Sequence, residues 1–285
     1  MSTTVVVTPS SILEQTKHVF DRIDNEMNEW KSGSPLAEVN RMAGVRAVKC
    51  PKNLCMHMER AIKLARQTEG AFDPSWACMW DLWDFKNPIL PGKDIVESRL
   101  PLIDWTKIEV GDDTIFLEEK GMSVGLGGFA KGVALHTADI VLRNTGAFDY
   151  MIQVGGQIVT RGKPRIIGIR KPDGLPHEII GTVELKNKSI STTGDYEKYF
   201  EVGGIRYHHV LDPKTGFPAR GVRSVTVITD IASYADAMST ALFVMGVEDG
   251  MIYVEATKRL EALFIAEDNS IHISSGFDFT KVQDK

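Results

Sequence analysis

The sequence predicts an α+β fold, and three observations favour that class. The chain has 285 residues, of which 43% are hydrophobic and 25% charged, close to the average of globular proteins. Helical and strand patterns both recur, but without the regular strand–helix–strand period of a doubly wound sheet. We find no internal repeat and no low-complexity linker. A chain of this length can bury a large core without help from a metal or a disulfide.

The N-terminal part of the chain is expected to form one strand and two amphipathic helices. A β-branched run over 3–8 predicts a short strand. Apolar residues at helical spacing predict a helix over 12–30, which Ser32-Gly33-Ser34-Pro35 ends. A second helix is expected over 51–69, with Gly70 as its C-terminal stop.

The middle and the C-terminal part differ in character. Residues 71–104 are rich in proline and tryptophan, which indicates a loop pinned to its own domain or, alternatively, a ligand platform. From residue 106 strands predominate, beginning with a hairpin around Gly111-Asp112-Asp113. The expected strands are 107–110, 114–117, 122–124, 150–154, 165–170, 179–185, 199–202, 205–210, 224–229, 260–266 and 271–274. The expected helices are 130–144, 233–245, which Gly246 ends, and 248–257.

The charge balance argues against a nucleic-acid partner. Lys and Arg number 33 and Asp and Glu number 38, which gives a net charge of −5. A mildly acidic chain without a long basic run is a poor nucleic-acid binder. Three cysteines without a C-x-x-C spacing predict free thiols in a reducing compartment: Cys50, Cys55 and Cys78.

No segment predicts a signal peptide or a membrane partner. The apolar start ends at Val7, and nothing approaches the roughly 18 apolar residues of a membrane-spanning helix. Taken from Met1, the chain is expected to be cytoplasmic. Removal of a leader before Met1 would instead make it periplasmic.

The first motif with chemical content is the glycine-rich run Gly125-Leu126-Gly127-Gly128, followed by Phe129-Ala130-Lys131-Gly132. Glycines between a strand and a helix let backbone N–H groups approach a phosphate, and the helix N-terminus adds positive potential. The run also fits a dinucleotide fingerprint, but the next strand ends in Gly155-Gly156-Gln157 and lacks the required acid. A phosphate-binding loop and a plain tight turn both stay open.

The second motif is the pair His208-His209, which a turn at 212–216 follows. Adjacent histidines on a strand point to opposite faces, so the pair is not a two-histidine metal site. One of them could face a site, and the whole segment could equally be structural.

The third motif places Asp236, Ser239 and Thr240 on one helix face. One carboxylate and two hydroxyls among alanines suit Mg²⁺ that is bound jointly with substrate phosphates. The alternative is a structural one, in which Asp236 interacts with the helix dipole and the hydroxyls bond back to the helix.

Together these segments resemble the FAD:protein FMN transferase family, also called ApbE-like. The resemblance spans nearly the whole chain, and its motifs follow the family's order. They are residues 1–4, Trp30 with 34–40, Ala71-Phe72-Asp73-Pro74, 81–85, the glycine run with Ala130-Lys131-Gly132, Val154-Gly155-Gly156, 193–196, the His209 segment and the Asp236 segment.

The resemblance implies one two-lobed α+β domain over 1–285, with mixed or antiparallel sheets flanked by helices and a cleft between the lobes. It implies Mg²⁺-dependent transfer of FMN from FAD, the substrate, to a Thr or Ser hydroxyl of an acceptor flavoprotein, with release of AMP. Such chemistry requires a clamped pyrophosphate, a cation that neutralises its charge and an activated hydroxyl.

The resemblance also implies the residues of the site. His209, as the acid/base group, and Asp236 would be catalytic. The metal would be held by the carbonyl of Ala130 and the side chains of Asp236, Ser239 and Thr240. The flavin would contact Met1, Trp30, Ala71, Phe72, Asp73, Gly127, Val133 and Val210.

Four positions depart from the family pattern. Ser2 replaces a glycine, and Gly125, His136 and Gln157 each replace an aspartate. None of the four belongs to the implied metal set, so FAD and Mg²⁺ are expected to be retained, while acceptor preference and flavin contacts are left open. Two other functions also stay open: a Mg²⁺-dependent FAD pyrophosphatase that yields FMN and AMP, and a non-catalytic FAD-binding protein.

Overall fold

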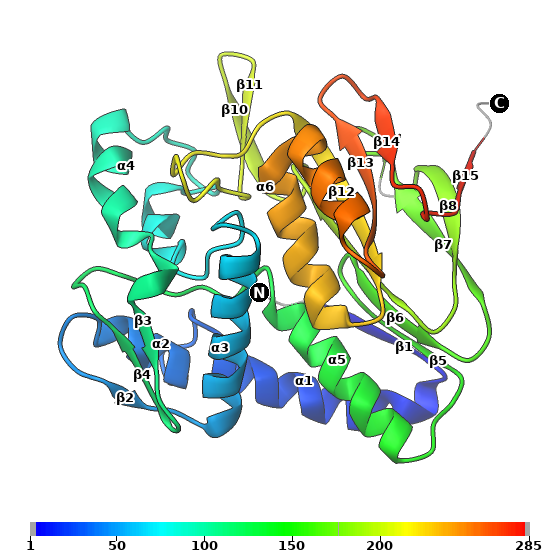
Figure 1. The fold of residues 1–285 in the computed structure, drawn as a ribbon, viewed down its shortest axis with the longest axis horizontal. Coiled ribbons are helices and arrows are strands. Elements are labelled where there is room, and N and C mark those ends of the chain that lie inside the picture. Colours follow the sequence, from blue (N-terminus) through cyan, green and yellow to red (C-terminus); the bar gives the residue numbers. More distant parts are fainter. Residues whose placement is uncertain (1–3, 176, 283–285) are drawn as a thin grey trace. The chain divides into compact units, whose positions relative to one another are not determined.

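The computed structural model describes residues 4–175 and 177–282, and its internal contacts divide the chain into two compact units. Unit 1 consists of Met1–Phe20, Lys131–Tyr196 and Arg220–Lys285. Unit 2 consists of Asp21–Ala130 and Glu197–Ala219. Each unit therefore combines segments that are distant in the sequence (Figure 1).

Unit 1 is built on a seven-stranded antiparallel sheet with the strand order β1-β5-β6-β9-β12-β13-β14. A second antiparallel sheet has the order β15-β8-β7. The unit also contains α6 and all but the first residue of α5. The bounds are β1 Val5–Thr8, α5 Ala130–Asn144, β5 Tyr150–Val154, β6 Gln157–Arg161, β7 Arg165–Arg170, β8 Ile179–Leu185, β9 Ser189–Gly194, β12 Val222–Thr229, α6 Ala232–Ala256, β13 Glu261–Ala266, β14 Ile271–Ile273 and β15 Phe279–Lys281.

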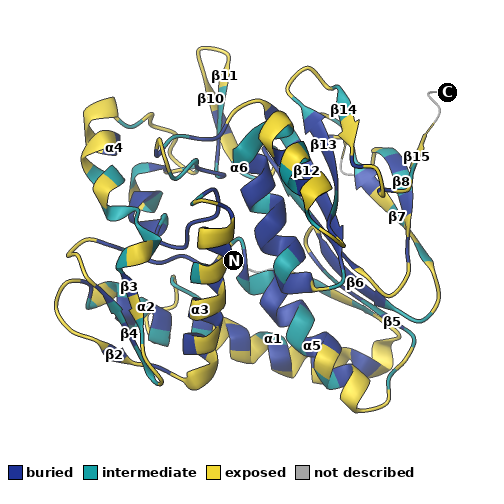
Figure 2. Ribbon diagram, viewed as in Figure 1, coloured by how far each residue is buried: buried dark blue, intermediate teal, exposed yellow. Residues whose placement is uncertain are grey.

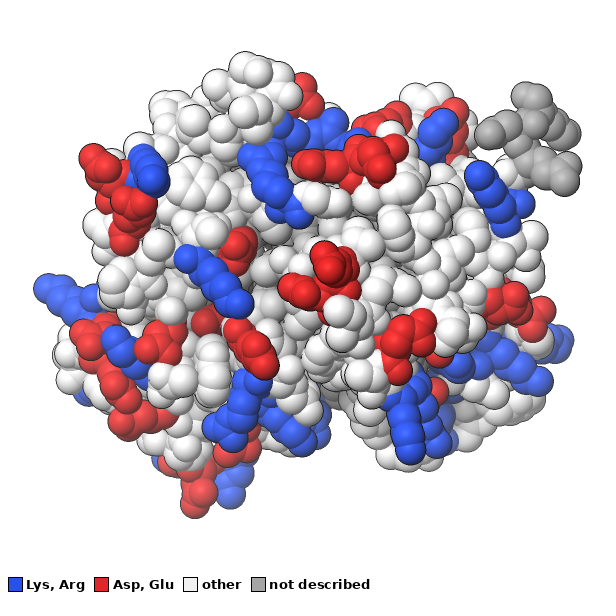
Figure 3. All heavy atoms as spheres, turned by 45° about the horizontal axis from the view of Figure 1, so that its top comes forward, with Lys and Arg blue, Asp and Glu red and all other residues white. Residues whose placement is uncertain are grey.

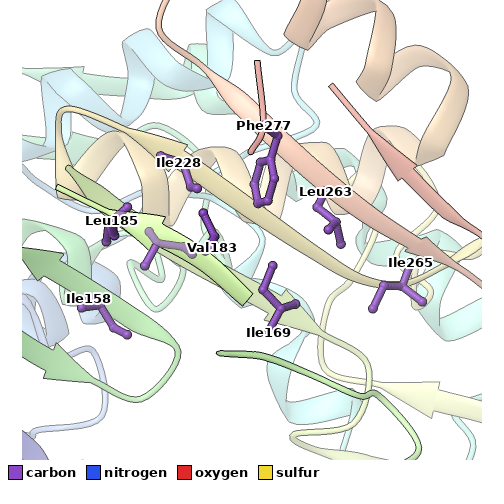
Figure 4. Packing of buried hydrophobic residues seen from close by; sticks show 9 residues of the cluster. Ile158, Ile169, Val183, Leu185, Ile228, Leu263, Ile265 and Phe277 are labelled. Carbon is purple, nitrogen blue, oxygen red and sulfur yellow. The ribbon is translucent and has the colours of Figure 1, made fainter. Parts of the chain in front are cut away.

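The seven-stranded sheet has two different faces, because side chains alternate along each strand. On β9, Ser191 and Thr193 contact α6, whereas Ile190 belongs to an apolar cluster that joins the two sheets of unit 1 (Figure 4). Burial of each such aliphatic side chain contributes roughly 1.5–3 kcal/mol. The cluster consists of Ile158, Ile169, Val183, Leu185, Ile190, Ile228, Leu263, Ile265 and Phe277. On β9, one face thus contributes to the core between the two sheets and the other contributes hydroxyls toward α6. The paired Val225 and Val227 of β12 are buried on the same side as these hydroxyls, so that face is partly apolar.

Unit 2 combines helices, a small antiparallel sheet of order β2-β4-β3 and a separate hairpin, β10–β11. Helix α1 crosses the boundary between the units at Phe20. An apolar cluster in this unit is rich in aromatic rings, among them Trp83 and Phe200. The bounds are α1 Leu13–Met27, α2 Pro35–Arg41, β2 Val48–Lys49, α3 Lys52–Gln67, α4 Lys93–Arg99, β3 Ile108–Val110, β4 Thr114–Leu117, β10 Tyr199–Val202 and β11 Ile205–His208.

The helix ends show how glycine sets the boundaries. Gly70 and Gly146 follow α3 and α5 and have φ values of 81° and 86°, a region that glycine adopts at little cost. The expected helix over 130–144 and the hairpin around Gly111 are confirmed. The helix expected over 12–30 ends earlier, at Met27, so Trp30 lies outside it.

Two local predictions are wrong for identifiable reasons. The strand expected at Met122–Val124 is absent, because the Asn40 side chain satisfies the backbone of Val124. Asn40 Nδ2 donates to the Val124 carbonyl oxygen at 2.9 Å, and the Val124 N–H donates to Asn40 Oδ1 at 2.7 Å. The Ser34-Pro35 pair does not merely end a helix, since the Ser34 hydroxyl caps α2 by accepting from the Ala37 N–H at 3.0 Å.

Helix α6 contains a break that the sequence predicts. At Gly246 the backbone leaves the helical region, with φ of 83°, so two shorter helices follow one another. Among residues 4–175 and 177–282, α6 is the one helix long and apolar enough to cross a membrane by length and composition. A core helix passes the same test, and the first half of α6 is largely buried and packs on β9 and β12 (Figure 2).

Charged side chains of both signs are interspersed on the face of the molecule shown in Figure 3. Charged side chains also pair within a unit, such as Arg165 with Asp149 at 2.9 Å in unit 1. This face shows no extended surface of one sign.

Candidate active site

The stripe of Asp236, Ser239 and Thr240 lies on the first half of α6, in unit 1. Positions three and four apart share a helix face, as the sequence predicts. The neighbouring Ala235 and Ala237 are small and buried, which lets the helix approach the sheet closely. The three oxygen-bearing side chains are thereby held against β9 and the start of α5.

Asp236 is 1% exposed, and each of its carboxylate oxygens accepts a hydrogen bond from a neutral donor. The Gly132 N–H donates to Oδ2 at 2.8 Å, and the Gln157 side-chain amide donates to Oδ1 at 3.0 Å. Burial raises the pKa of the Asp236 carboxyl, while the nearby charge of Lys131 and the two hydrogen bonds act in the opposite direction. The carboxylate is thus fixed in orientation but only partly compensated in charge.

Gly132 permits this contact because α5 and α6 meet at their backbones. A Cβ atom at this position would lie 2.5 Å from both the carbonyl oxygen of Ala232 and the Cβ of Asp236. No side chain fits at such a separation without displacing α6. The glycine next to Ala130-Lys131 is therefore required by close packing against the helix that carries Asp236.

Ser239 is fully buried, and its hydroxyl has three partners. It donates to the Asp236 carbonyl oxygen at 2.9 Å. The hydroxyls of Ser191 and Thr193, 3.1 and 2.8 Å away, then donate to it. In this arrangement the Ser239 hydroxyl links α6 to β9, and the metal-ligand role expected from the sequence stays a prediction.

Thr240 differs from Ser239, since it is half-buried and its hydroxyl makes only long contacts. Its Oγ1 lies 3.5 Å from the Asp236 carbonyl oxygen and 3.4 Å from Thr193 Oγ1. Such contacts are weak and leave oxygen lone pairs accessible. Asp236 and Thr240 together present one carboxylate and one neutral oxygen from the same helix face.

This donor set fits Mg²⁺ better than a transition metal. Across the described part of the chain, no group of three or more His, Cys, Asp and Glu side chains could hold a metal ion. Mg²⁺ is commonly held by one or two carboxylates together with substrate phosphates and water. Ala130, whose carbonyl is the fourth expected ligand, is the first residue of α5 and precedes Gly132 by two positions.

The expected flavin residues Ala71, Phe72 and Asp73 lie together in a buried turn of unit 2, between α3 and a 3₁₀ helix, Ala77–Leu82. The Asp73 carboxylate accepts from the Ser75 N–H at 2.8 Å and from its hydroxyl at 2.6 Å. Burial raises the pKa of Asp73, and these bonds oppose that shift. Asp73 therefore shapes the turn that presents Phe72.

Trp30 is the most accessible ring of an aromatic group in unit 2. It is 51% exposed, and its ring centroid lies 5.5 Å from that of Trp80. Trp80 in turn contacts Trp76 and Phe85, at 5.3 and 5.7 Å, and has the ammonium of Lys198 5.6 Å above its ring. An exposed ring supported from behind by others is suited to stack on a flat ligand.

The two histidines occupy different environments, as expected for neighbours at a strand end. The His208 ring is buried, with Nε2 2.9 Å from the Ala219 carbonyl oxygen and Nδ1 accepting from the Val210 N–H at 3.3 Å. His208 is thus held on both nitrogens and is structural. His209 follows the end of β11, is half-buried and stays the candidate for acid/base chemistry.

The other expected site residues are divided between the units. Val133 is buried within α5 in unit 1, and Val210 is buried in unit 2. Gly127, also in unit 2, has no atom within 4 Å of the place where a Cβ would stand. Met1 lies outside the described residues.

Three site residues of unit 1 carry no role in the sequence-based prediction: Gln157, Ser191 and Thr193. They share the sheet face toward α6, since Gln157 pairs with Ser191 across β6 and β9 and Thr193 follows two positions later. Ile190 between Ser189 and Ser191 is the one alternating signal for this face, and it ends at Thr192-Thr193. These polar residues also explain why β6 and β9 were not predicted, because apolar residues usually occupy the positions of a strand that face a helix.

The sequence matches the ApbE family model over residues 1–264. It is 29% identical to the FAD:protein FMN transferase of Treponema pallidum, covering 93% of this chain and 79% of that protein, and 29% identical to that of Klebsiella pneumoniae, covering 90% and 83%. The solved structure of the ApbE protein from Thermotoga maritima aligns with a TM-score of 0.87 at 31% identity, covering 96% and 94% of the two chains. These matches confirm the α+β fold and the resemblance, and the chain belongs to the ApbE family.

Proposed function

We propose that this ApbE-family chain is a Mg²⁺-dependent FAD:protein FMN transferase, which moves FMN from FAD to a Thr or Ser hydroxyl of an acceptor protein and releases AMP. The observation that carries the proposal is the buried Asp236 carboxylate, held on both oxygens by neutral donors and accompanied by the Thr240 hydroxyl. The family match over residues 1–264 and the names of the relatives support it.

The reaction exchanges the phosphoanhydride bond of FAD for a phosphate ester bond to the acceptor. The acceptor oxygen bonds to the phosphorus of the FMN moiety, the bond from that phosphorus to the bridging oxygen of AMP breaks, and the hydroxyl proton is taken up. Bound Mg²⁺ would neutralise charge on the pyrophosphate. We assign its ligands to Asp236, Ser239, Thr240 and the carbonyl of Ala130, and the Ser239 hydroxyl also links α6 to β9.

His209 is our candidate for the group that accepts the hydroxyl proton. Imidazole titrates near neutral pH, which suits general base catalysis. Replacement of His209 by Asn is expected to lower kcat by roughly 10²- to 10⁴-fold while FAD binding is retained. Unchanged kcat would remove His209 from the mechanism.

The flavin contacts in unit 2 are proposed at Trp30, Ala71, Phe72, Asp73, Gly127 and Val210. From unit 1 we include Val133, and Met1 completes the set. The two units would then serve as the two lobes of one catalytic domain. The proposed flavin contact of Trp30 is supported by its exposed ring, which packs on Trp80.

The decisive experiment incubates the protein with FAD, Mg²⁺ and a Thr-containing acceptor protein, followed by mass spectrometry of the acceptor. We expect FMN attached through a phosphodiester, and none with the Asp236→Asn variant. FMN release at the same rate without any acceptor would instead identify an FAD pyrophosphatase. Binding of FAD without either product would identify a flavin-binding protein.

We propose a cytoplasmic acceptor for this enzyme. The cysteines Cys50, Cys55 and Cys78 are free thiols, which fits a reducing compartment. Recovery of the flavinylated acceptor from a cytoplasmic fraction tests this, and recovery from the periplasm would contradict it.

A further inference from the structure

Gln157 lies beside the candidate cation site in a position that the sequence left without a role. It is the first residue of β6, directly after the turn formed by Gly155-Gly156. Its side chain is 6% exposed and faces α6, where Nε2 donates to Asp236 Oδ1 at 3.0 Å. The contact joins residues 79 positions apart.

The orientation of the Gln157 amide is determined by Asp236. A carboxylate oxygen accepts hydrogen bonds, so the NH₂ group must face it and the carbonyl oxygen must face away. Turning the amide by half a rotation would bring two acceptors together. Gln157 therefore cannot exchange its two ends while Asp236 is ionised.

This fixed orientation leaves Gln157 Oε1 buried without a hydrogen-bond partner among the described residues. A buried acceptor in that state costs roughly 1–3 kcal/mol. Its position beside Asp236 indicates a donor that is present only when the site is filled. Mg²⁺ keeps several of its waters when bound by few protein ligands, and such waters are hydrogen-bond donors.

We infer that Gln157 is a positioning residue of the cation site, which holds the Asp236 carboxylate through Nε2 and accepts a hydrogen bond through Oε1 from water carried by the bound cation. The inference rests on the proposed function, because it takes Asp236 to be a cation ligand. Gly132 and Gln157 each occupy one oxygen of the carboxylate, which fixes its plane while leaving further lone pairs toward the cation. Residues that orient metal ligands in this way typically change metal affinity by about 10- to 100-fold when they are replaced.

The resemblance described above implies an aspartate at position 157, where this chain has a neutral amide. A carboxylate here would place a second negative charge against buried Asp236 and would repel it. The amide instead supplies a donor on one side and an acceptor on the other without adding charge. The chain thus keeps a polar group at 157 while changing its charge.

The competing interpretation is purely structural, with Gln157 closing the turn at Gly155-Gly156. A Cβ at Gly155 would lie 3.5 Å from Gln157 Oε1, so the side chain does fold back toward the turn. On that interpretation, replacement lowers the free energy of unfolding and leaves cation affinity unchanged. The two interpretations therefore differ in a binding measurement that needs no turnover.

The test titrates Mn²⁺ into the full-length protein with saturating FAD and no acceptor, while electron paramagnetic resonance reports free Mn²⁺. We expect Gln157→Met to raise the Kd for Mn²⁺ by about tenfold or more, and to raise the Mg²⁺ concentration for half-maximal transfer while kcat at saturating Mg²⁺ changes less. The matched control is Gln153→Met. Gln153 lies on neighbouring β5 and donates to the Gly155 carbonyl oxygen at 3.3 Å, so we expect no change in Kd.

A second variant guards against misfolding of the first. Gln157→Asn keeps the amide but shortens its reach, and we expect it also to weaken Mn²⁺ binding. Parental affinity in both variants would overturn the inference and leave the proposed function intact, provided that Asp236→Ala abolishes Mn²⁺ binding. Parental affinity in Asp236→Ala would overturn the cation site itself, and the inference with it.

Discussion

The residues predicted for the site differ in chemistry between the two units. In unit 1 these residues are small and rich in oxygen: Ser239 and Thr240 contact the hydroxyls of Ser191 and Thr193 at 2.8–3.4 Å, and Asp236 lies on the same helix face. In unit 2 they include Trp30, whose ring belongs to an aromatic group with Trp76, Trp80 and Phe85 at centroid distances of 5.3–5.7 Å. This difference indicates separate roles: the oxygen atoms of unit 1 are suited to bind a cation, and the aromatic rings of unit 2 are suited to contact a flat apolar ligand.

The contrast also concerns tolerance to change. Hydrogen-bonded oxygens lose their function when they shift by a fraction of an ångström, because electrostatic stabilisation depends on fixed geometry. Aromatic contacts are less directional, and an exposed ring such as that of Trp30 can adjust. Changes to the oxygen-rich cluster of unit 1 should therefore affect kcat and metal dependence, whereas changes to the aromatic group of unit 2 should affect KM for FAD.

The largest effect is expected for Asp236→Ala, which removes the single buried carboxylate of the unit 1 cluster. FMN transfer should fall by about 10²-fold or more, equivalent to roughly 3 kcal/mol of transition-state stabilisation. The control is Asp230→Ala, since Asp230 precedes α6 and pairs with exposed Arg259 at 3.2 Å. Full activity of Asp236→Ala at limiting Mg²⁺ would contradict the assignment of this residue.

A pair of glycine variants tests the difference between the units directly. Gly132→Ala would force a Cβ to within 2.5 Å of Asp236 Cβ, so we expect about 1–3 kcal/mol of destabilisation and a transfer rate lower by roughly 10²-fold. Gly127→Ala meets nothing within 4 Å and should keep the melting temperature while raising KM for FAD. Thermal melts and initial rates distinguish them, and equal melting losses in both variants would contradict this contrast.

Two tryptophans of unit 2 separate binding from folding. Trp30→Ala should raise KM for FAD by roughly 2- to 13-fold, the equivalent of one aromatic contact of about 0.5–1.5 kcal/mol, with little loss of stability. Trp83 is 1% exposed, and Trp83→Ala should lower the free energy of unfolding by about 3–5 kcal/mol. Denaturant melts together with FAD titrations provide the comparison; a stability loss in Trp30→Ala as large as that of Trp83→Ala would argue against a ligand-facing ring.

The subtlest effect concerns the pH dependence of stability without metal. Burial raises the pKa of Asp236 above its ordinary value of 3.8, so the folded state binds the proton more tightly than the unfolded chain. The free energy of unfolding then falls as pH rises from 3.8 through the raised pKa. The fall amounts to about 1.4 kcal/mol for each tenfold difference in proton affinity between the folded and unfolded states.

Asp236→Asn lacks this titration and provides the comparison for that measurement. Relative to the parent, the variant should gain stability as pH rises through this interval, and the gain should disappear at lower pH, where the parent carboxyl is protonated. Urea melts across the pH range, with chelator present, measure the difference. A constant offset between the two proteins would show that Asp236 does not titrate as inferred.

The longer helices α1, α3, α5 and α6 and the hydroxyl-bearing stripe could be predicted because their signals are local, whereas the short helices α2 and α4 were not predicted. Apolar spacing predicts α5, glycines with positive φ end α3 and α5, and a period near four places Asp236 with Thr240. Such features depend on residues a few positions apart. They required no knowledge of which strands pair.

The remaining features depend on long-range register. Strands β6 and β9 escaped prediction because Gln157, Ser191 and Thr193 occupy the buried face that apolar residues usually fill. The bond from Gln157 to Asp236 exists only once β6 has paired with β9 and α6 has packed above both. Gln157, which stood out in the sequence because it replaces an aspartate of the resembled pattern, donates a hydrogen bond to the buried Asp236 carboxylate.

Strand β9 has a further consequence for how the protein tolerates insertions. Ile190 faces the apolar cluster, whereas Ser191 and Thr193 face α6. One extra residue ahead of Ser189 would exchange these directions. The hydroxyls of Ser191 and Thr193 would then face the apolar cluster, and Ile190 would face α6. We therefore expect insertions to be tolerated in the turns on either side of β9, and not within the strand, where they would change which side chains face α6.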